Sequence, residues 1–136
     1  MIVVTGATGQ LGHAIVQKLI QHLPINQIGA SCRDPEKASH LSSQGVRVRR
    51  GDFAETDALA DAFEGATQIL LVSSNARTYG GDPLAQHAAV IDAAKAAGVR
   101  RIVYTSQIAS STTSAFPPAH DHAATEKMLA ESGRGP

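Results

Sequence analysis

Three glycines at a spacing of three residues constrain this chain more than any other feature of its sequence. They lie in segment 6–12, Gly-Ala-Thr-Gly-Gln-Leu-Gly, directly after the β-branched run Ile2–Thr5. A buried strand that ends in a glycine-rich turn and leads into a helix is typical of loops that hold a pyrophosphate. There, Gly6 permits the tight turn, Gly9 lets the backbone approach the phosphates, and Gly12 permits close packing of the helix. The helix N-terminus offers amides and a positive dipole to the same group. A plain tight turn is the alternative interpretation.

The rest of the chain alternates between strand-like and helix-like segments. The expected strands are Ile2–Thr5, Gln27–Cys32, Val46–Val48, Ile69–Val72 and Arg101–Ser106. The expected helices are Leu11–Ile20 with one apolar face, a helix capped by Asp34 with Pro35 at its first position, a helix capped by Thr56, Pro83–Ala97 closed by Gly98, and roughly Asp121–Glu131. This alternation predicts an α/β fold of the Rossmann type, a doubly wound parallel sheet with strand order 3-2-1-4-5.

The composition gives no indication of a nucleic-acid or membrane partner. The 136 residues include 12 basic and 12 acidic side chains, so the net charge is zero and no long-range field favours nucleic acid or a membrane surface. No apolar run is long enough to span a bilayer. The single cysteine, Cys32, cannot form an internal disulfide, which fits a reducing compartment. We therefore expect a cytoplasmic protein of one domain, residues 1–136, without a metal site.

The end of the sequence falls where a further strand is expected. Residues 132–136, Ser-Gly-Arg-Gly-Pro, follow the last predicted helix, and a sixth strand would cover the exposed edge of the fifth. We expect the domain to be incomplete here, truncated before strand six.

The end of the second strand bears on the choice of cofactor. A site for NAD usually places an acidic residue there to bind the ribose 2′-hydroxyl, whereas this chain has Arg33. A guanidinium suits a 2′-phosphate, and Lys37 adds a second positive charge one turn later. The pattern favours NADP(H) over NAD(H). Alternatively, Arg33 is a solvated arginine, and Asp34 pairs with one of the two cations.

Asp52 and Phe53 follow the third strand at the same edge of the sheet. An acid and an aromatic ring at this position can contact the adenine amine and ring face. The alternative is a loop residue beside a core phenylalanine.

Several segments together resemble one known family, the NmrA-like atypical short-chain dehydrogenase/reductases. Within it, the likeness is greatest to the type 2 NADPH:quinone oxidoreductases and triphenylmethane reductases. The resemblance implies that a sixth strand and a small C-terminal substrate domain are missing after residue 133. The segments that carry the resemblance are 6–13 (GATGQLGH), 32–35 (CRDP), 51–53 (GDF), 71–74 (LVSS), 94–99 (AKAAGV) and 102–106 (IVYTS).

The resemblance implies a set of cofactor-binding residues. They are Gly6, Thr8, Gly9, Gln10, Leu11 and Gly12 at the pyrophosphate, Arg33 and Lys37 near the 2′-phosphate, Asp52 and Phe53 near adenine, Ser73, Ser74 and Asn75 along the ribose and nicotinamide, and Tyr104, Thr105 and Ser106 at the nicotinamide end. The loop Ser73–Asp82 is then a candidate to close over the nicotinamide, although an ordinary long connection explains it equally.

Catalytic residues are harder to assign. Short-chain dehydrogenases typically carry a Tyr-x-x-x-Lys pair, but neither Tyr79 nor Tyr104 is followed by lysine at that spacing. Comparison with the larger family puts Pro118 and His122 at the Tyr and Lys positions. We name His122 and Tyr104 as the catalytic candidates, because His122 can hydrogen-bond ribose or substrate.

Two other residues are candidates for the same site. His87 could face the cleft from the helix after strand four, and Glu126 lies one turn after His122. Surface or helix-capping histidines and a solvated glutamate are the plainer interpretations.

The sequence leaves two functions open, and a third possibility is that the domain has no activity of its own. One is hydride transfer from NADPH to a quinone or similar conjugated acceptor, which tolerates the missing acid because a hydroquinone anion can take a proton from water. The other is a non-catalytic NADP sensor, a role known among NmrA-like relatives. A domain that binds cofactor weakly and does nothing alone is a third possibility. Relatives often pair as homodimers.

Overall fold

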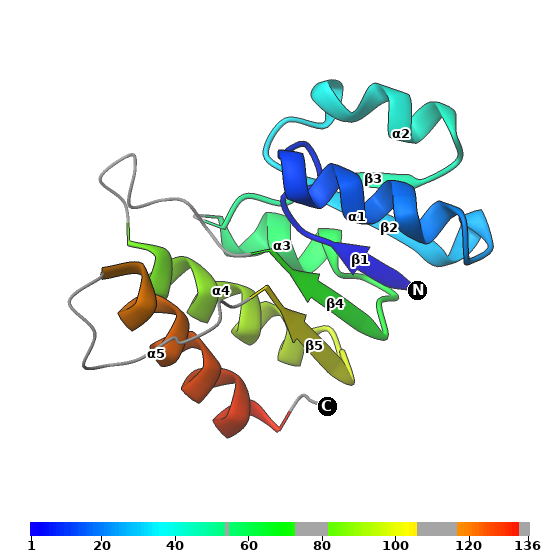
Figure 1. The fold of residues 1–136 in the computed structure, drawn as a ribbon. Coiled ribbons are helices and arrows are strands. Elements are labelled where there is room, and N and C mark those ends of the chain that lie inside the picture. The colour runs from blue at the N-terminus through cyan, green and yellow to red at the C-terminus, as the bar shows by residue number, and fades with distance from the viewer. Residues whose placement is uncertain (54, 73–81, 106–116, 134–136) are drawn as a thin grey trace.

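The computed structural model describes residues 1–53, 55–72, 82–105 and 117–133. Five parallel strands form one sheet in the order β3-β2-β1-β4-β5, which confirms the predicted fold class and strand order (Figure 1). The strands are β1 (Ile2–Val4), β2 (Ile28–Cys32), β3 (Arg47–Arg50), β4 (Gln68–Leu71) and β5 (Arg101–Tyr104). The helices are α1 (Gln10–Ile20), η1 (Ile25–Gln27), η2 (Pro35–Ala38), α2 (Ser39–Ser43), α3 (Thr56–Ala62), α4 (Pro83–Ala96) and α5 (Pro117–Ser132).

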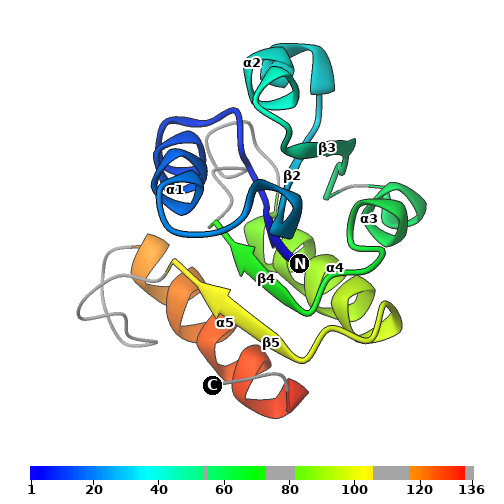
Figure 2. The same cartoon turned by 90° about the vertical axis from the view of Figure 1, so that its right-hand side faces the viewer.

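Two apolar clusters lie on opposite faces of this sheet. Val3 and Val4 are neighbours on β1, so their side chains point to opposite faces, and both are fully buried. Val4 belongs to the cluster under α1 and α2, and Val3 to the cluster under α3 and α4. Figure 2 shows α1 and α2 on one side of the strands and α3 and α4 on the other. Burial on both faces explains why the central strands β1 and β4 are mostly apolar without alternation.

The last helix, α5, packs beside α4 on the second of these faces. Met128 and Leu129 of α5 lie against the cluster that contains Val3. Val103 of β5 points to the other face and keeps 38% of its surface exposed. The sheet is therefore covered more completely over β1 and β2 than over β5.

Several predicted helix boundaries are confirmed by their capping contacts. The Asp34 carboxylate accepts a hydrogen bond from the amide of Glu36 at 3.2 Å, with Pro35 first in η2. Gly98 follows α4 with φ of +76°, a conformation that favours glycine and commonly ends a helix.

The predicted cap of α3 is wrong. Thr56 is the first helical residue, and Glu55 takes the cap position without a side-chain capping bond. The reason is that the Glu55 carboxylate is bound to the Arg50 guanidinium through contacts of 2.6 and 2.8 Å. This ion pair lowers the pKa of Glu55 and raises that of Arg50.

Other boundaries shift for identifiable reasons. Helix α5 begins at Pro117 instead of Asp121, because proline is tolerated in the first turn, where its missing amide has no intrahelical partner. Strand β3 extends to Arg50, since its pairing with β2 continues as far as Cys32. Leu11, expected on the apolar face of α1, is 51% exposed.

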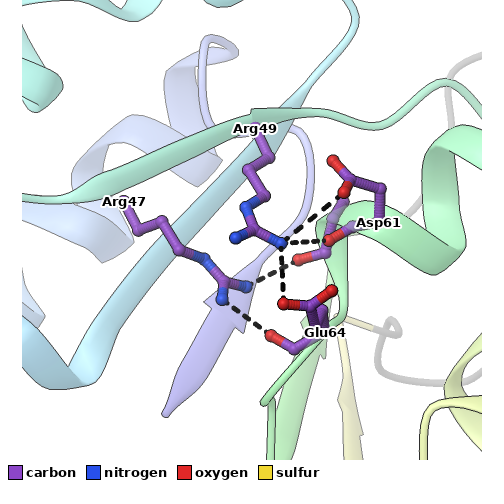
Figure 3. Close-up of polar contacts among 5 residues, drawn as sticks. Arg47, Arg49, Asp61 and Glu64 are labelled. Atoms are coloured by element: carbon purple, nitrogen blue, oxygen red, sulfur yellow. Dashed lines mark hydrogen bonds and ion pairs between the residues drawn. The ribbon is translucent and has the colours of Figure 1, made fainter.

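Arginines on the edge strand β3 bind the C-terminal end of α3 (Figure 3). The Arg47 guanidinium donates to the carbonyls of Glu64 at 2.7 Å and Ala62 at 2.9 Å. Arg49 donates to the Asp61 carbonyl at 2.7 Å and lies within 4 Å of two carboxylates. The last carbonyls of a helix have no intrahelical donor, so these contacts fix α3 against the sheet. Burial lowers the pKa of Arg47, although the group stays charged.

Among the described residues, no helix combines the length and apolar character needed to cross a membrane.

We predict that Arg47→Met lowers the free energy of unfolding by about 1–3 kcal/mol, because it removes charged donors from two helix carbonyls while keeping the aliphatic stem. Urea denaturation followed by circular dichroism measures this loss. Arg50→Met, which removes an ion pair at the surface, is the control and should leave the midpoint almost unchanged. Equal effects of the two substitutions would contradict the proposed anchoring of α3.

Candidate functional site

The glycine loop closes on itself between β1 and α1. The amide of Gly9 donates to the carbonyl of Gly6 at 3.0 Å, and Gly6 has φ of +60°. A Cβ added at Gly12 would lie 2.1 Å from the Gly6 carbonyl oxygen. No side chain fits into that space, so only glycine lets the first turn of α1 approach the loop this closely.

The first turn of α1 presents amides without partners. Gly9 is the cap residue and has no side chain to offer, and the first turn contains no acidic residue. The backbone amides of Gln10, Leu11 and Gly12 have no acceptor among the described residues. Such a group of amides at the positive end of a helix dipole is suited to an anion.

Hydrogen bonds fix this loop at the carboxyl edge of the sheet. The amide of Ala7 donates to the carbonyl of Ser31 at the end of β2, at 3.2 Å. On the other side, the Thr5 hydroxyl accepts from the amide of Val72 at 3.0 Å. The loop thus sits at the centre of the sheet, with β2 on one side and β4 on the other (Figure 1).

The two cations predicted to contact the 2′-phosphate of the cofactor lie beside this edge. Arg33 and Lys37 are both exposed, one directly after β2 and the other in η2. The carboxylate of Asp34 lies between them in sequence and caps η2. Cys32 ends β2 and is buried, and its burial together with the nearby Asp34 raises the pKa of the thiol.

Asp52 and Phe53 leave β3 at the same edge. Gly51 before them packs against β2, where an added Cβ would lie 2.0 Å from the Ser31 hydroxyl oxygen. The Asp52 carboxylate is 3.8 Å from Arg50, and Phe53 packs against the core cluster that contains Val3. The interpretation of Phe53 as a core residue thereby gains support, and contact with adenine stays a prediction.

The catalytic candidates Tyr104 and His122 are in direct contact. The Tyr104 hydroxyl and Nδ1 of His122 are 2.6 Å apart, and both side chains are half-buried. Tyr104 ends β5, and His122 lies in the N-terminal half of α5. The pair bridges the sheet and α5 at the carboxyl end of β5.

Behind this pair lies a buried polar contact that the sequence did not predict. His87 is 1% exposed, and its Nδ1 is 2.8 Å from the hydroxyl of the fully buried Thr125. The His87 ring also meets the Tyr104 ring edge-on at 5.4 Å. His87 therefore faces α5 and β5, which corrects the surface and helix-capping interpretations.

Thr125 was missed although a signal for it exists. His122, Thr125 and Leu129 have the i, i+3, i+7 spacing of one helical face, and that face meets α4 and β5. Glu126 is exposed, so its plainer interpretation as a solvated side chain stands.

Four predicted cofactor residues, Ser73, Ser74, Asn75 and Ser106, lie outside the described residues, as does most of the Ser73–Asp82 loop. Thr105 is half-buried, and its amide donates to the Leu71 carbonyl at 3.0 Å. It thus continues the pairing of β4 with β5.

Comparison with known families settles the class of the domain. A family model described as NAD(P)H-binding matches residues 6–134. The chain belongs to this NAD(P)H-binding family. Its predicted resemblance to NmrA-like oxidoreductases is confirmed as well, because it is 36% identical to an NmrA-like family domain-containing oxidoreductase of Aspergillus flavus over 96% of the chain and 43% of that relative.

Two further relatives are more similar in sequence to this chain than the Aspergillus flavus protein is. Quinone oxidoreductase 2 of Escherichia coli is 47% identical over 98% of this chain and 45% of its own length. The structure of Citrobacter sp. triphenylmethane reductase complexed with NADP(H) superposes with a TM-score of 0.89 at 42% identity, over 98% of this chain and 46% of that one. The chain spans less than half the length of these relatives.

We predict that Gly12→Ala lowers the free energy of unfolding by about 3 kcal/mol, the upper end for an overpacked site, because the new methyl would displace the Gly6 carbonyl. NADPH affinity, measured by fluorescence titration, should fall with it. Gly98→Ala is the control, since a Cβ there meets nothing within 4 Å and only the positive φ costs energy. Its NADPH affinity should stay unchanged. Wild-type affinity in Gly12→Ala would show that the loop does not depend on this close approach.

A second prediction concerns the buried contact behind Tyr104. Thr125→Val keeps the side-chain shape but removes the hydroxyl that contacts His87, so we expect a loss of about 1–3 kcal/mol in thermal or urea unfolding. Thr67→Val removes an exposed hydroxyl that donates to the Met1 carbonyl, and it should change stability by less than about 0.5 kcal/mol. If both variants are equally stable, the His87 contact does not stabilise the packing of α4 against α5.

Proposed function

We propose that this domain is the cofactor-binding part of an NADPH-dependent reductase that passes a hydride to quinones or similar conjugated acceptors. The observation that carries the proposal is the closed glycine loop with three free amides beside the exposed Arg33 and Lys37. The relatives named for quinone reduction and for NADP(H) binding support it. The cytoplasmic location and the homodimer expected from the sequence belong to the same proposal.

The residues present fit a dinucleotide. The space that a Cβ would fill at Gly12, and the unpaired amides of Gln10, Leu11 and Gly12, suit a pyrophosphate above the first turn of α1. Gly6, Thr8 and Gly9 complete that loop. Asp52 and Phe53 would contact adenine, and Ser73, Ser74, Asn75, Tyr104, Thr105 and Ser106 would line the ribose and nicotinamide.

Specificity for the phosphorylated cofactor follows from charge. Arg33 and Lys37 bring two exposed cations to the end of β2. Asp34 and Glu36 lie between them in sequence, and the Asp34 carboxylate caps η2. A 2′-phosphate gains charge-assisted hydrogen bonds from such a pair, whereas a 2′-hydroxyl does not.

The chemistry asks the protein first for binding and orientation of the cofactor. When bound, the reduced nicotinamide supplies a hydride. The chain's own residues hold and orient the cofactor along the carboxyl edge of the sheet, from Gly6 to Tyr104. A Tyr-x-x-x-Lys pair is not required for an acceptor whose reduced form is a stable anion.

A sensor that binds NADP without turnover is the second candidate, and the missing lysine at that position favours it. Mixing the native polypeptide that contains this chain with NADPH and a small quinone, and following nicotinamide absorbance, separates the two functions. Consumption above the uncatalysed rate supports the reductase. Tight NADP binding without consumption supports the sensor.

We predict that Arg33→Ala weakens NADPH binding by about 10- to 100-fold, the equivalent of one or two charge-assisted hydrogen bonds, and NADH binding by less than about threefold. Isothermal titration with both cofactors measures the difference. Arg100→Ala removes an exposed arginine before β5, at the opposite edge of the sheet, and should change neither affinity. An equal loss for NADPH and NADH in Arg33→Ala would overturn the assignment of the 2′-phosphate site.

A further inference from the structure

We propose that Tyr104 and His122 form a proton relay that protonates the oxygen of the acceptor as it is reduced. The inference rests on the proposed reductase function and adds a proton donor to it. It replaces the Tyr-x-x-x-Lys pair, which this chain lacks, by a pair drawn from two different elements, β5 and α5.

The contact between the two side chains is short and partly shielded from water. The Tyr104 hydroxyl oxygen lies 2.6 Å from Nδ1 of His122, which is the distance of a strong hydrogen bond. Both side chains are half-buried, so solvent competes with this bond less than at an open surface. Their rings lie 5.6 Å apart.

The pair occupies the edge of the sheet where the reacting end of the cofactor is expected. Tyr104 pairs in register with Leu71 on β4, and β4 pairs directly with β1. Adjacent strands are roughly 4.8 Å apart, so the carboxyl end of β5 is about 10 Å from the end of β1, where the glycine loop begins. A dinucleotide whose pyrophosphate lies at that loop extends along this edge.

The hydrogen bond has a defined direction in the relay. A tyrosine hydroxyl that donates to Nδ1 leaves the imidazole proton on Nε2. Nε2 of His122 has no hydrogen-bond partner among the described residues, so it is available to donate to a bound acceptor. Protons then move in one direction, from Tyr104 through His122 to the acceptor.

Buried groups behind the pair hold Tyr104 in place. His87 meets the tyrosine ring edge-on at 5.4 Å, and His87 is itself bound to Thr125 at 2.8 Å. Because Thr125 and His122 lie one turn apart on α5, the same helix face supports both ends of the arrangement. His87 and Thr125 are thus positioning residues.

The proton balance of the step is complete. Hydride addition to a quinone places two electrons and one proton on the acceptor and leaves a negative charge on its oxygen. His122 gives its Nε2 proton to that oxygen and takes the Tyr104 proton at Nδ1, and the tyrosinate regains a proton from water. Overall, the phenol of Tyr104 gives a proton to the hydroquinone anion, which is itself the anion of a phenol. Because the donor and the product are chemically alike, the transfer is close to thermoneutral, which suits general acid catalysis.

Two acceptors that differ in their need for a proton test this proposal. A quinone develops negative charge on oxygen as it is reduced, whereas a cationic triarylmethyl dye becomes neutral when hydride adds to its central carbon and needs no proton. In the native polypeptide that contains this chain, Tyr104→Phe and His122→Asn should lower kcat for a small quinone by about 100-fold, the lower end for a positioned proton donor. The rate with the dye, measured at saturating NADPH, should fall far less than the rate with the quinone.

The substitutions are chosen to spare the structure. Phenylalanine keeps the ring that meets His87, and asparagine keeps a hydrogen-bond acceptor near the position of Nδ1 but cannot pass a proton. His22→Asn, which changes an exposed histidine beyond the end of α1, is the matched control and should leave both rates unchanged. Equal losses with quinone and dye would show a purely structural role and overturn the relay, as would unchanged rates with both.

Two results separate the relay from the proposed function. If the wild-type protein reduces neither acceptor, both proposals fail. If it reduces only the quinone, the rates in heavy and light water decide. A slower wild-type rate in heavy water that disappears in Tyr104→Phe supports the relay, and an isotope effect that is the same in both proteins overturns it.

A measurement without cofactor or acceptor completes the test. Nitrogen-15 NMR of His122 at neutral pH should show Nδ1 as an unprotonated nitrogen whose resonance moves in Tyr104→Phe. A protonated Nδ1 would reverse the hydrogen bond and overturn the relay, whatever the activity of the loaded protein.

Discussion

The approach of Gly12 to the Gly6 carbonyl is the contact on which the rest of the site depends. It brings the first turn of α1 against the end of β1, so that three amides open toward the carboxyl edge of the sheet. Thr5 and Ala7 tie the same loop to β4 and β2. A displaced loop would therefore disturb both neighbouring strands as well as the amides, so the proposed pyrophosphate site and the centre of the sheet depend on each other.

The carboxyl edge of the sheet has two halves, one around α1 and β2 and the other around β5, and they are stabilised in different ways. Around α1 and β2, backbone hydrogen bonds and glycines set the geometry, and the side chains that matter, such as Arg33, are exposed. Around β5, side chains set the geometry, through the contact of Tyr104 with His122 and of His87 with Thr125. The first half is suited to binding a charged group through the main chain, and the second to placing a proton next to a reacting atom.

Local sequence patterns predicted the backbone geometry around α1 and β2 well, but they did not predict the buried side-chain contacts around β5. The glycine spacing, the strand before it and the cap at Asp34 are contiguous in sequence, and short-range sterics and hydrogen bonding determine them. Thr56 is not the cap, because α3 begins one residue earlier than predicted and Glu55 takes the cap position, and Leu11, predicted on the apolar face of α1, is exposed. The contact of His87 with Thr125 spans 38 residues and arises only when α4 and α5 pack. Single-sequence reasoning contains no information on such distant partners.

The burial of Cys32 bears on how this protein would tolerate the compounds it is proposed to handle. Quinones are electrophiles that add to thiolates, and a protein that binds them repeatedly exposes its own nucleophiles to arylation. The only thiol of this chain is 2% exposed, and burial and Asp34 both disfavour its ionised form. The single thiol of this chain therefore offers no thiolate to an electrophilic acceptor.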